Sequence, residues 1–157
     1  MRCKGFGLVE LLVTVGILVL LASAFLLNAS GVRTRAREAL AMEHGGSVAQ
    51  AVRGYLGIWI TDTPTEFFTR IAGQLPEPDW TGAPAGARAG AAASDRSCTE
   101  SFTLTAPDGT PTLYSWPSAP RGVGCVLGLR NDGGIIRLRT ITWVGGSGRF
   151  YVDGLSP

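Results

Sequence analysis

A long apolar run near the N-terminus constrains this chain more than any other feature. From Phe6 to Ala29 the only charged side chain is Glu10. A helix of about 20 such residues crosses the hydrocarbon core of a bilayer. A carboxylate inside that segment costs roughly 2.5 kcal/mol or more, so it usually has a partner. The run therefore predicts a membrane-compatible helix in which Glu10 has a specific role.

The residues around this acid form a pattern. A short basic leader with Arg2 and Lys4 ends at Gly5, and Phe6 opens the apolar run shortly before Glu10. The pattern resembles the N-terminus of type IV pilin and pseudopilin precursors. The resemblance implies that a prepilin peptidase cuts after Gly5 and that Phe6 becomes the N-methylated terminus. It also implies that Glu10 faces that terminal ammonium, in its own chain or in a neighbouring subunit, and so sets the register of assembly.

Two simpler interpretations compete with this one. An ordinary secretory signal would be cut after Ala22-Ser23-Ala24, an A-x-A site behind a basic and an apolar region. Against it, Glu10 lies inside the apolar region and the run continues through Leu27. A plain membrane anchor would need neither the Gly5–Phe6 step nor the acid. We therefore favour the pilin-like interpretation.

Length and charge bound the rest of the chain. The 157 residues are enough for one small domain beyond the helix. Of the 14 basic side chains, Arg2 and Lys4 lie in the leader, and the others balance the 12 acidic ones. A neutral mature chain does not require nucleic acid or an acidic surface as a partner. Flanking charge gives no orientation, because the span is also followed by Arg33, Arg35 and Arg37. A cytoplasmic N-terminus is inferred from the leader pattern.

Beyond the span, apolar residues recur at three- to four-residue spacing, which predicts an amphipathic helix. These residues are Val32, Ala36, Leu40, Val48, Val52, Tyr55 and Trp59. Pro64 disfavours helix directly before it, so we expect the helix to end near Asp62. A short helix is expected between Thr65 and Leu75. The Ala, Gly and Pro composition of residues 82–91 then predicts a mobile surface loop.

Cysteine usage points to an exported domain. Cys3 would leave with the leader, which leaves Cys98 and Cys125. Two cysteines in an exported chain predict a disulfide bond. Such a bond would add roughly 3 kcal/mol of stability. Two unpaired buried thiols are the alternative.

From Cys98 onward, short alternating segments are separated by turn residues. The expected strands are 101–105, 112–116, 125–130, 135–144 and 149–152. Local turns between them predict an antiparallel meander, whose apolar face with Ile136, Leu138 and Val144 needs a cover. The helix after Val32 would supply it. One long N-terminal helix, transmembrane in its N-terminal half, packed on a C-terminal antiparallel sheet is an α+β, pilin-like fold, as the resemblance implies.

These observations divide the chain into five expected segments. They are a leader peptide over residues 1–5, a transmembrane or filament-core helix over 6–30, an amphipathic helix over 31–62, a connecting loop over 63–97 and a sheet domain over 98–157.

The sequence offers no constellation for catalysis. His44 is the only histidine and is expected on the solvated side of its helix. Lys4 is the only lysine, so the chain has no phosphate-binding loop of the G-x-x-x-x-G-K-[ST] type. Asp108 and Asp132 lie in turns, which aspartate favours without any metal. We therefore expect a protein that is not an enzyme and needs no cofactor or metal.

Four arginines raise the question of a nucleic-acid partner. Arg137 and Arg139 project to one side of their strand, and Arg130 and Arg149 lie on the neighbouring predicted strands. A row of arginines on a sheet can hold DNA phosphates, as in pilin-like proteins that serve DNA uptake. A solvated sheet face explains the same residues, and we favour it.

The resemblance implies a structural subunit of a type IV pilus-like filament. Its expected partners are the prepilin peptidase, an inner-membrane assembly platform, other pilins, further copies of the chain and, before assembly, membrane lipid. The chain would begin as a single-pass inner-membrane protein and end in an extracellular or periplasmic filament. A type II secretion pseudopilin and a minor pilin for DNA uptake are the alternatives. A membrane-tethered enzyme would need a catalytic group.

Processing of the leader is directly testable. We expect mass spectrometry of the protein from its native cell to show a mature chain that begins at a methylated Phe6. A chain that begins at Phe25 would instead identify Ala22-Ser23-Ala24 as a signal-peptidase site and contradict the pilin-like interpretation.

Overall fold

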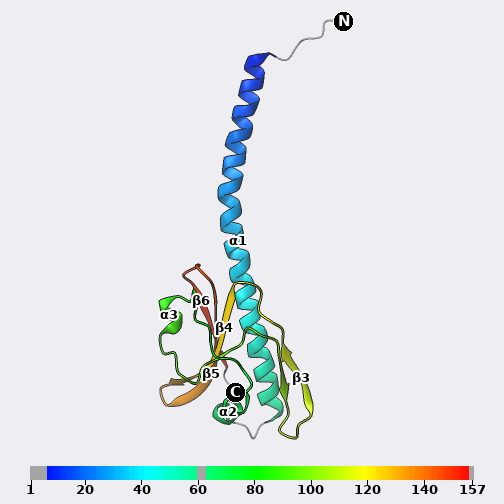
Figure 1. Cartoon of the computed structure of the whole chain (residues 1–157), viewed down its shortest axis with the longest axis vertical. Coiled ribbons are helices and arrows are strands. Elements are labelled where there is room, and N and C mark those ends of the chain that lie inside the picture. Colours follow the sequence, from blue (N-terminus) through cyan, green and yellow to red (C-terminus); the bar gives the residue numbers. More distant parts are fainter. Residues whose placement is uncertain (1–6, 60–62, 156–157) are drawn as a thin grey trace. The chain divides into compact units, whose positions relative to one another are not determined.

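The computed structural model describes residues 7–59 and 63–155, and the chain divides into two compact units. The first unit ends at Ala36 and the second begins at Arg37. In its described residues the first unit is helix alone, whereas the second contains all the strands (Figure 1). The hydrophobic core therefore lies in the second unit.

Helix α1 runs from Leu8 to Ile58 without interruption. Its N-terminal part, Leu8–Phe25, is long and apolar enough to cross a membrane, with a mean hydropathy of 2.5. None of this part is buried within the protein. The predicted helix end near Asp62 lies outside the described residues, and α1 ends at Ile58.

The strands form two antiparallel sheets (Figure 1). They are β1 Arg96–Ser97, β2 Phe102–Thr105, β3 Pro111–Trp116, β4 Val123–Asp132, β5 Ile135–Val144 and β6 Phe150–Leu155. One sheet has the order β1-β4-β5-β6, and the other is the hairpin β2-β3. The turn between β4 and β5 is Gly133-Gly134, both with positive φ, which suits a two-residue hairpin loop. The α+β class and the antiparallel strands agree with the sequence-based prediction.

The hairpin β2-β3 departs from the single meander that the strand spacing predicts. Its two strands pair with each other rather than with β4. The edge of β4 that the hairpin would need is already taken by β1, where Arg96 pairs with Leu127 and Ser97 with Val126. A two-residue strand of this kind has too little periodicity to be seen in the sequence.

Two short helices follow α1 in the sequence and precede the first strand. Helix α2, Pro64–Ala72, falls in the segment where a short helix is predicted, and α3 spans Ala85–Arg88. A capping box begins α2: the Thr63 backbone N–H donates to the Glu66 carboxylate over 2.8 Å, and the Glu66 backbone N–H donates to Thr63 Oγ1 over 3.3 Å. The hydrogen bonds from the Thr63 backbone and hydroxyl lower the pKa of Glu66.

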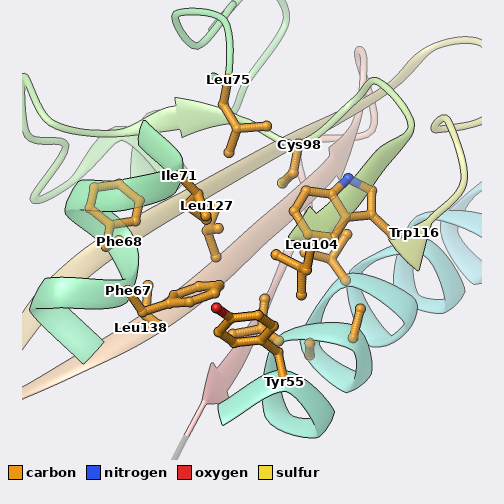
Figure 2. Packing of buried hydrophobic residues seen from close by; sticks show 14 of the residues in the cluster. Tyr55, Phe67, Phe68, Ile71, Leu75, Cys98, Leu104, Trp116, Leu127 and Leu138 are labelled. Carbon is orange, nitrogen blue, oxygen red and sulfur yellow. The ribbon is translucent and has the colours of Figure 1, made fainter. Parts of the chain in front are cut away.

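The main core lies between α1, α2 and one face of the strands (Figure 2). The rings of Tyr55 on α1 and Phe67 on α2 lie 5.1 Å apart. The buried Tyr55 hydroxyl donates to the carbonyl of Thr105 over 3.2 Å and accepts from Arg70, so no polar group of this ring is left unpaired. The largest fully buried side chains of the cluster are Tyr55, Phe67, Leu104, Trp116, Leu127 and Leu138.

The buried stripe of α1 begins later than the apolar spacing predicts. Val48, Val52 and Tyr55 are buried as expected, but Val32 and Leu40 are exposed. The buried side of α1 begins instead at Glu38, and small residues follow it. Ala41 is buried, and a Cβ added at Gly45 would lie 3.1 Å from Thr142 Cγ2 on β5. The helix therefore packs closely on β5 at positions that apolar periodicity does not mark.

The second face of the four-stranded sheet is also covered. Trp143 on β5 lies over Gly124 on β4, where an added Cβ would come within 2.2 Å of the indole ring. Trp80 stacks on Trp143 with 5.4 Å between ring centroids and 7° between planes. Ala87 of α3 is buried against the same cluster. Residues 82–91 were predicted to form a mobile surface loop, but they include helix α3 and the buried Ala87, because the sheet has a second apolar face that this segment covers.

The close contact between Gly124 and Trp143 leads to a stability prediction. Gly124→Ala should lower the free energy of unfolding by about 1–3 kcal/mol, since Trp143 is held by Trp80 and cannot yield freely. Gly46→Ala, in the interior of α1 with nothing within 4 Å of the added Cβ, should raise it by about 0.5–1 kcal/mol. Chemical denaturation of the full chain in detergent, followed by tryptophan fluorescence, measures both. If Gly124→Ala left the free energy of unfolding unchanged, the close packing of Trp143 on Gly124 would be contradicted.

Candidate functional site

The apolar part of α1 is the first candidate site. Glu10 lies in the first turn of this helix, where a negative charge is favoured by the unpaired backbone N–H groups. Its side chain is exposed and makes no ion pair with any residue in the ranges 7–59 and 63–155. Gly5 and Phe6, the predicted cleavage and methylation positions, lie outside the described residues. The predicted pairing of Glu10 with the Phe6 ammonium therefore stays a prediction.

The other polar side chains of the span need no external partner. The Thr14 hydroxyl donates to the carbonyls of Glu10 and Leu11 over 3.0 and 2.9 Å. The Ser23 hydroxyl donates to the carbonyl of Val19 over 2.8 Å. Hydroxyls satisfied in this way are compatible with a hydrocarbon environment. Glu10 is thus the one side chain of Leu8–Phe25 that calls for a partner from outside the helix.

Cys98 and Cys125 form a disulfide, with 5.0 Å between their Cα atoms. The bond links the residue after β1 to β4, and the Cys98 backbone N–H also donates to the Cys125 carbonyl over 3.1 Å. Both cysteines are buried in the main core. The disulfide therefore holds the short strand β1 on the edge of β4.

His44 is not on a solvated side of its helix, so that prediction is wrong. The side chain is only 4% exposed, and its Nε2 lies 2.9 Å from the Cys98 carbonyl oxygen. That contact requires a proton on Nε2, which then donates. Burial lowers the pKa of His44, and the hydrogen bond to Cys98 opposes this only in part. The imidazole is a structural contact between α1 and the disulfide.

The four arginines considered for DNA do not form one row. Arg130 and Arg137 are paired across β4 and β5, and Arg139 follows on the same face. Arg149 lies directly before β6 rather than on it, and its guanidinium reaches Glu38 of α1 at 3.5 Å. Arg149 therefore reaches toward the helix side of the sheet, whereas the other three lie on the opposite face.

Three of these arginines also have carboxylate partners within the chain. Arg130 forms a bidentate pair with Asp95, with both N–O distances at 2.8 Å, and Arg139 pairs with Asp132. Arg149 pairs with Glu38. Each pairing neutralises charge that a phosphate backbone would need, so the arrangement gives little support to DNA binding.

The Asp95–Arg130 pair is an important interaction that the sequence analysis missed. The Asp95 side chain is fully buried, and it also accepts from the Ala92 backbone N–H over 3.1 Å. Gly128 makes room for it, because an added Cβ there would lie 2.2 Å from Asp95 Oδ1. A glycine inside an otherwise apolar strand often marks such a close approach, and this was the available signal. The pair fastens the end of the low-complexity segment to β4.

Within the described part of the chain, no three His, Cys, Asp or Glu side chains are grouped so that they could hold a metal ion. Two surface grooves lie beside α1. One, of about 530 Å³, is bordered by Gln50, Gly54 and Tyr114, and another, of about 330 Å³, lies along β6. The linings carry hydroxyl, amide and apolar groups, and the first groove also contains the Arg53 guanidinium.

A long apolar N-terminal helix followed by an antiparallel sheet defines an α+β protein with a pilin-like fold. Residues 1–26 match the family model of the prokaryotic N-terminal methylation motif, which is the prepilin signature of type IV pilins and pseudopilins. No curated protein and no solved structure matches the chain significantly.

The motif supports a type IV pilin-like or pseudopilin protein, and it points to a structural subunit rather than an enzyme. It implies processing by a prepilin peptidase and assembly with other pilins. The apolar helix and the motif together fit a membrane-anchored pilin.

Burial of His44 generates a pH prediction. Because the folded-state pKa is lowered, the unfolded chain takes up a proton first as the pH falls below about 6.5. The stability that neutral His44 contributes is therefore complete above that pH and declines as the pH falls toward 5. Urea denaturation in detergent should show a steeper loss between pH 7 and pH 5 for the wild type than for His44→Gln. Glu43, which lines the same surface hollow, is present in both proteins. Equal pH dependence in the two would contradict the buried neutral imidazole.

Proposed function

We propose that this protein is a type IV pilin-like structural subunit of a cell-surface filament, cleaved by a prepilin peptidase and assembled through the apolar part of α1. In this proposal residues 1–5 are the leader, residues 6–30 form the filament-core helix and the sheets form the solvent-facing domain. The observation that carries the proposal is the apolar helical segment Leu8–Phe25, none of which is buried within the protein. Residues 1–26 also match the N-terminal methylation motif.

The energetics of assembly follow from that helix. Its exposed apolar surface is stable in a bilayer and equally stable in a bundle of sister helices, because both keep it from water. Transfer from one to the other on an inner-membrane platform would never expose the helix to solvent. The net driving force of assembly then depends on packing and on the few polar groups that the helix carries.

Glu10 is the polar group on which assembly would depend. The hydroxyls of Thr14 and Ser23 already donate to carbonyls of their own helix, so they need no hydrogen bond from an added subunit. Glu10 would pair with the ammonium of the methylated Phe6 of a neighbour, since an unpaired charge in the core is strongly unfavourable. The requirement for this contact would fix the axial position of each subunit relative to the next.

The alternatives differ in what the filament does. A type II secretion pseudopilin would use the same helix and the same acid in a short periplasmic filament. A minor pilin for DNA uptake has less support, because Arg130, Arg139 and Arg149 are paired with carboxylates. The pseudopilin alternative predicts the same behaviour of Glu10 as the proposed pilin-like subunit.

The test is substitution of Glu10. Glu10→Leu should leave membrane insertion intact or improve it, because an unfavourable charge leaves the span. It should impair assembly, because the ammonium of the neighbour would lose its partner. Glu10→Asp should give an intermediate result, since the charge is kept and its reach is shortened. The measurement is the ratio of filament-associated to membrane-retained subunit, with leader cleavage followed in parallel.

Thr14→Val provides the matched control. It removes a polar group of similar depth that is satisfied within the helix, so it should assemble at the wild-type level. Cleavage should proceed in all variants, because the predicted cut depends on Gly5. Wild-type filament levels from Glu10→Leu would refute the assembly mechanism.

A further inference from the structure

In the described part of the first unit, charge is confined to the two ends of the helix. From Leu11 to Ala36 the sequence contains no acid, and its only charged residues are Arg33 and Arg35. Both are exposed, and neither forms an ion pair with any residue in the ranges 7–59 and 63–155. The chain beyond the leader is neutral as a whole, but this end of the helix presents two positive charges to its surroundings.

The two arginines follow the apolar run at the depth of the lipid headgroups. The helix from Leu8 to Leu27 is about 30 Å long, which equals the thickness of the hydrocarbon core of a bilayer. Arg33 lies about 9 Å further along the helix axis. Val32, which is 64% exposed, continues the apolar surface as far as Arg33. Because side chains on a helix are directed toward its N-terminus, long arginine side chains at these positions extend back toward the bilayer.

The positions of the arginines around the helix favour a lipid surface over a protein partner. Residues two positions apart on an α-helix are rotated by about 200°, so Arg33 and Arg35 lie on opposite sides of α1. A bilayer surrounds a helix that spans it, and headgroups are therefore available to both side chains at nearly the same depth. A protein that packs on one side of the helix would reach only one of the two.

Control of membrane orientation does not account for these arginines. Excess arginine and lysine normally marks the cytoplasmic side of a membrane span. The proposed function places the N-terminus of the helix in the cytoplasm, and Arg33 and Arg35 are then on the opposite side. Their position after the span therefore calls for a different reason, such as a ligand of negative charge.

We propose that Arg33 and Arg35 bind the phosphate groups of anionic phospholipids at the outer surface of the inner membrane, before the subunit is assembled. The planar guanidinium donates two parallel hydrogen bonds to a phosphate, and the two charges attract it. A zwitterionic headgroup carries its own cation beside the phosphate, so a lipid with net negative charge is the preferred ligand. The inference rests on the proposed function, which supplies the membrane span and its orientation.

Lipid binding at this position would affect both storage and assembly of the subunit. Two phosphate contacts at the end of the span fix the depth of the helix in the bilayer. When the subunit leaves the membrane for a filament, the arginines exchange lipid phosphate for water or for groups of other subunits. The lipid contacts therefore oppose premature removal, whereas Glu10 at the other end of the helix acts after removal, in the filament.

The test measures which lipid the full chain retains. The protein is placed in nanodiscs of equal parts phosphatidylglycerol and phosphatidylcholine with the same acyl chains, and native mass spectrometry determines the lipids that stay bound. We expect the wild type to prefer phosphatidylglycerol. The preference should fall about fivefold for Arg33→Gln and further for the double variant Arg33→Gln/Arg35→Gln. Lysine at both positions should give an intermediate preference, because the charge remains and the bidentate geometry is lost.

Arg121→Gln is the matched control. It removes the same charge from an exposed arginine of the second unit that forms no ion pair within the described ranges, so the lipid preference should stay at the wild-type level. Because all three arginines are exposed, chemical denaturation should show equal stability for every variant. Arg2, Lys4 and Arg37 are the same in all of these proteins.

A second arm separates membrane lipid from free phosphate. Ammonium phosphate added to the nanodiscs should displace no more phosphatidylglycerol than ammonium acetate of the same ionic strength, because a soluble ion lacks acyl chains that pack beside the helix. Displacement specific to phosphate would show a site for the free ion and overturn the assignment to lipid. Equal retention of the two lipids by the wild type, or an equal effect of Arg33→Gln and Arg121→Gln, would also overturn it. These results would leave the filament proposal standing, since its test is Glu10, whereas a mature chain that begins at Phe25 would lack the span and remove both.

Discussion

An apolar helical surface that the protein does not bury is the constraint on which the rest of this structure depends. Residues Leu8–Phe25 are uncovered, and their hydroxyls are satisfied by the carbonyls of the same helix. Such a segment has to be kept from water by lipid or by other helices. Glu10 is the exception, because a carboxylate in either environment requires a counter-charge. In the proposed function, membrane anchoring, assembly and axial register depend on this exposed surface and on Glu10.

The second unit, by contrast, buries apolar surface on both faces of its four-stranded sheet. Helices α1 and α2 bury one face around Tyr55 and Phe67, and the segment with Trp80 and Ala87 buries the other. The Asp95–Arg130 pair then fastens that segment, and removal of one partner from a buried pair typically costs about 3–5 kcal/mol. With the faces occupied, the surfaces left for recognition are strand edges and the grooves beside α1.

Charge in this unit is used mostly within the chain. Arginines that form a plausible phosphate-binding row in the sequence are distributed over two faces, and three of them meet carboxylates. His44 is likewise held neutral against the Cys98 carbonyl rather than exposed to solvent. A surface of this kind favours contacts through shape, backbone hydrogen bonds and apolar groups over contacts through net charge.

Local pattern by itself determined the apolar helix with its single acid, the α+β class and most of the strands, because these depend on periodicity and turn residues close in sequence. It also indicated the Cys98–Cys125 bond, since two cysteines remain once the leader is removed. Only the tertiary structure decided that β1 takes the edge of β4, that His44 is buried and that the Ala/Gly/Pro-rich stretch covers a sheet face. The partners in those contacts are far apart in the chain: Asp95 meets Arg130, and Trp80 meets Trp143. Gly128 permits the approach of Asp95, and Gly124 permits that of Trp143. The reason for a glycine at either position can be recognised only when the neighbour that occupies the space is known.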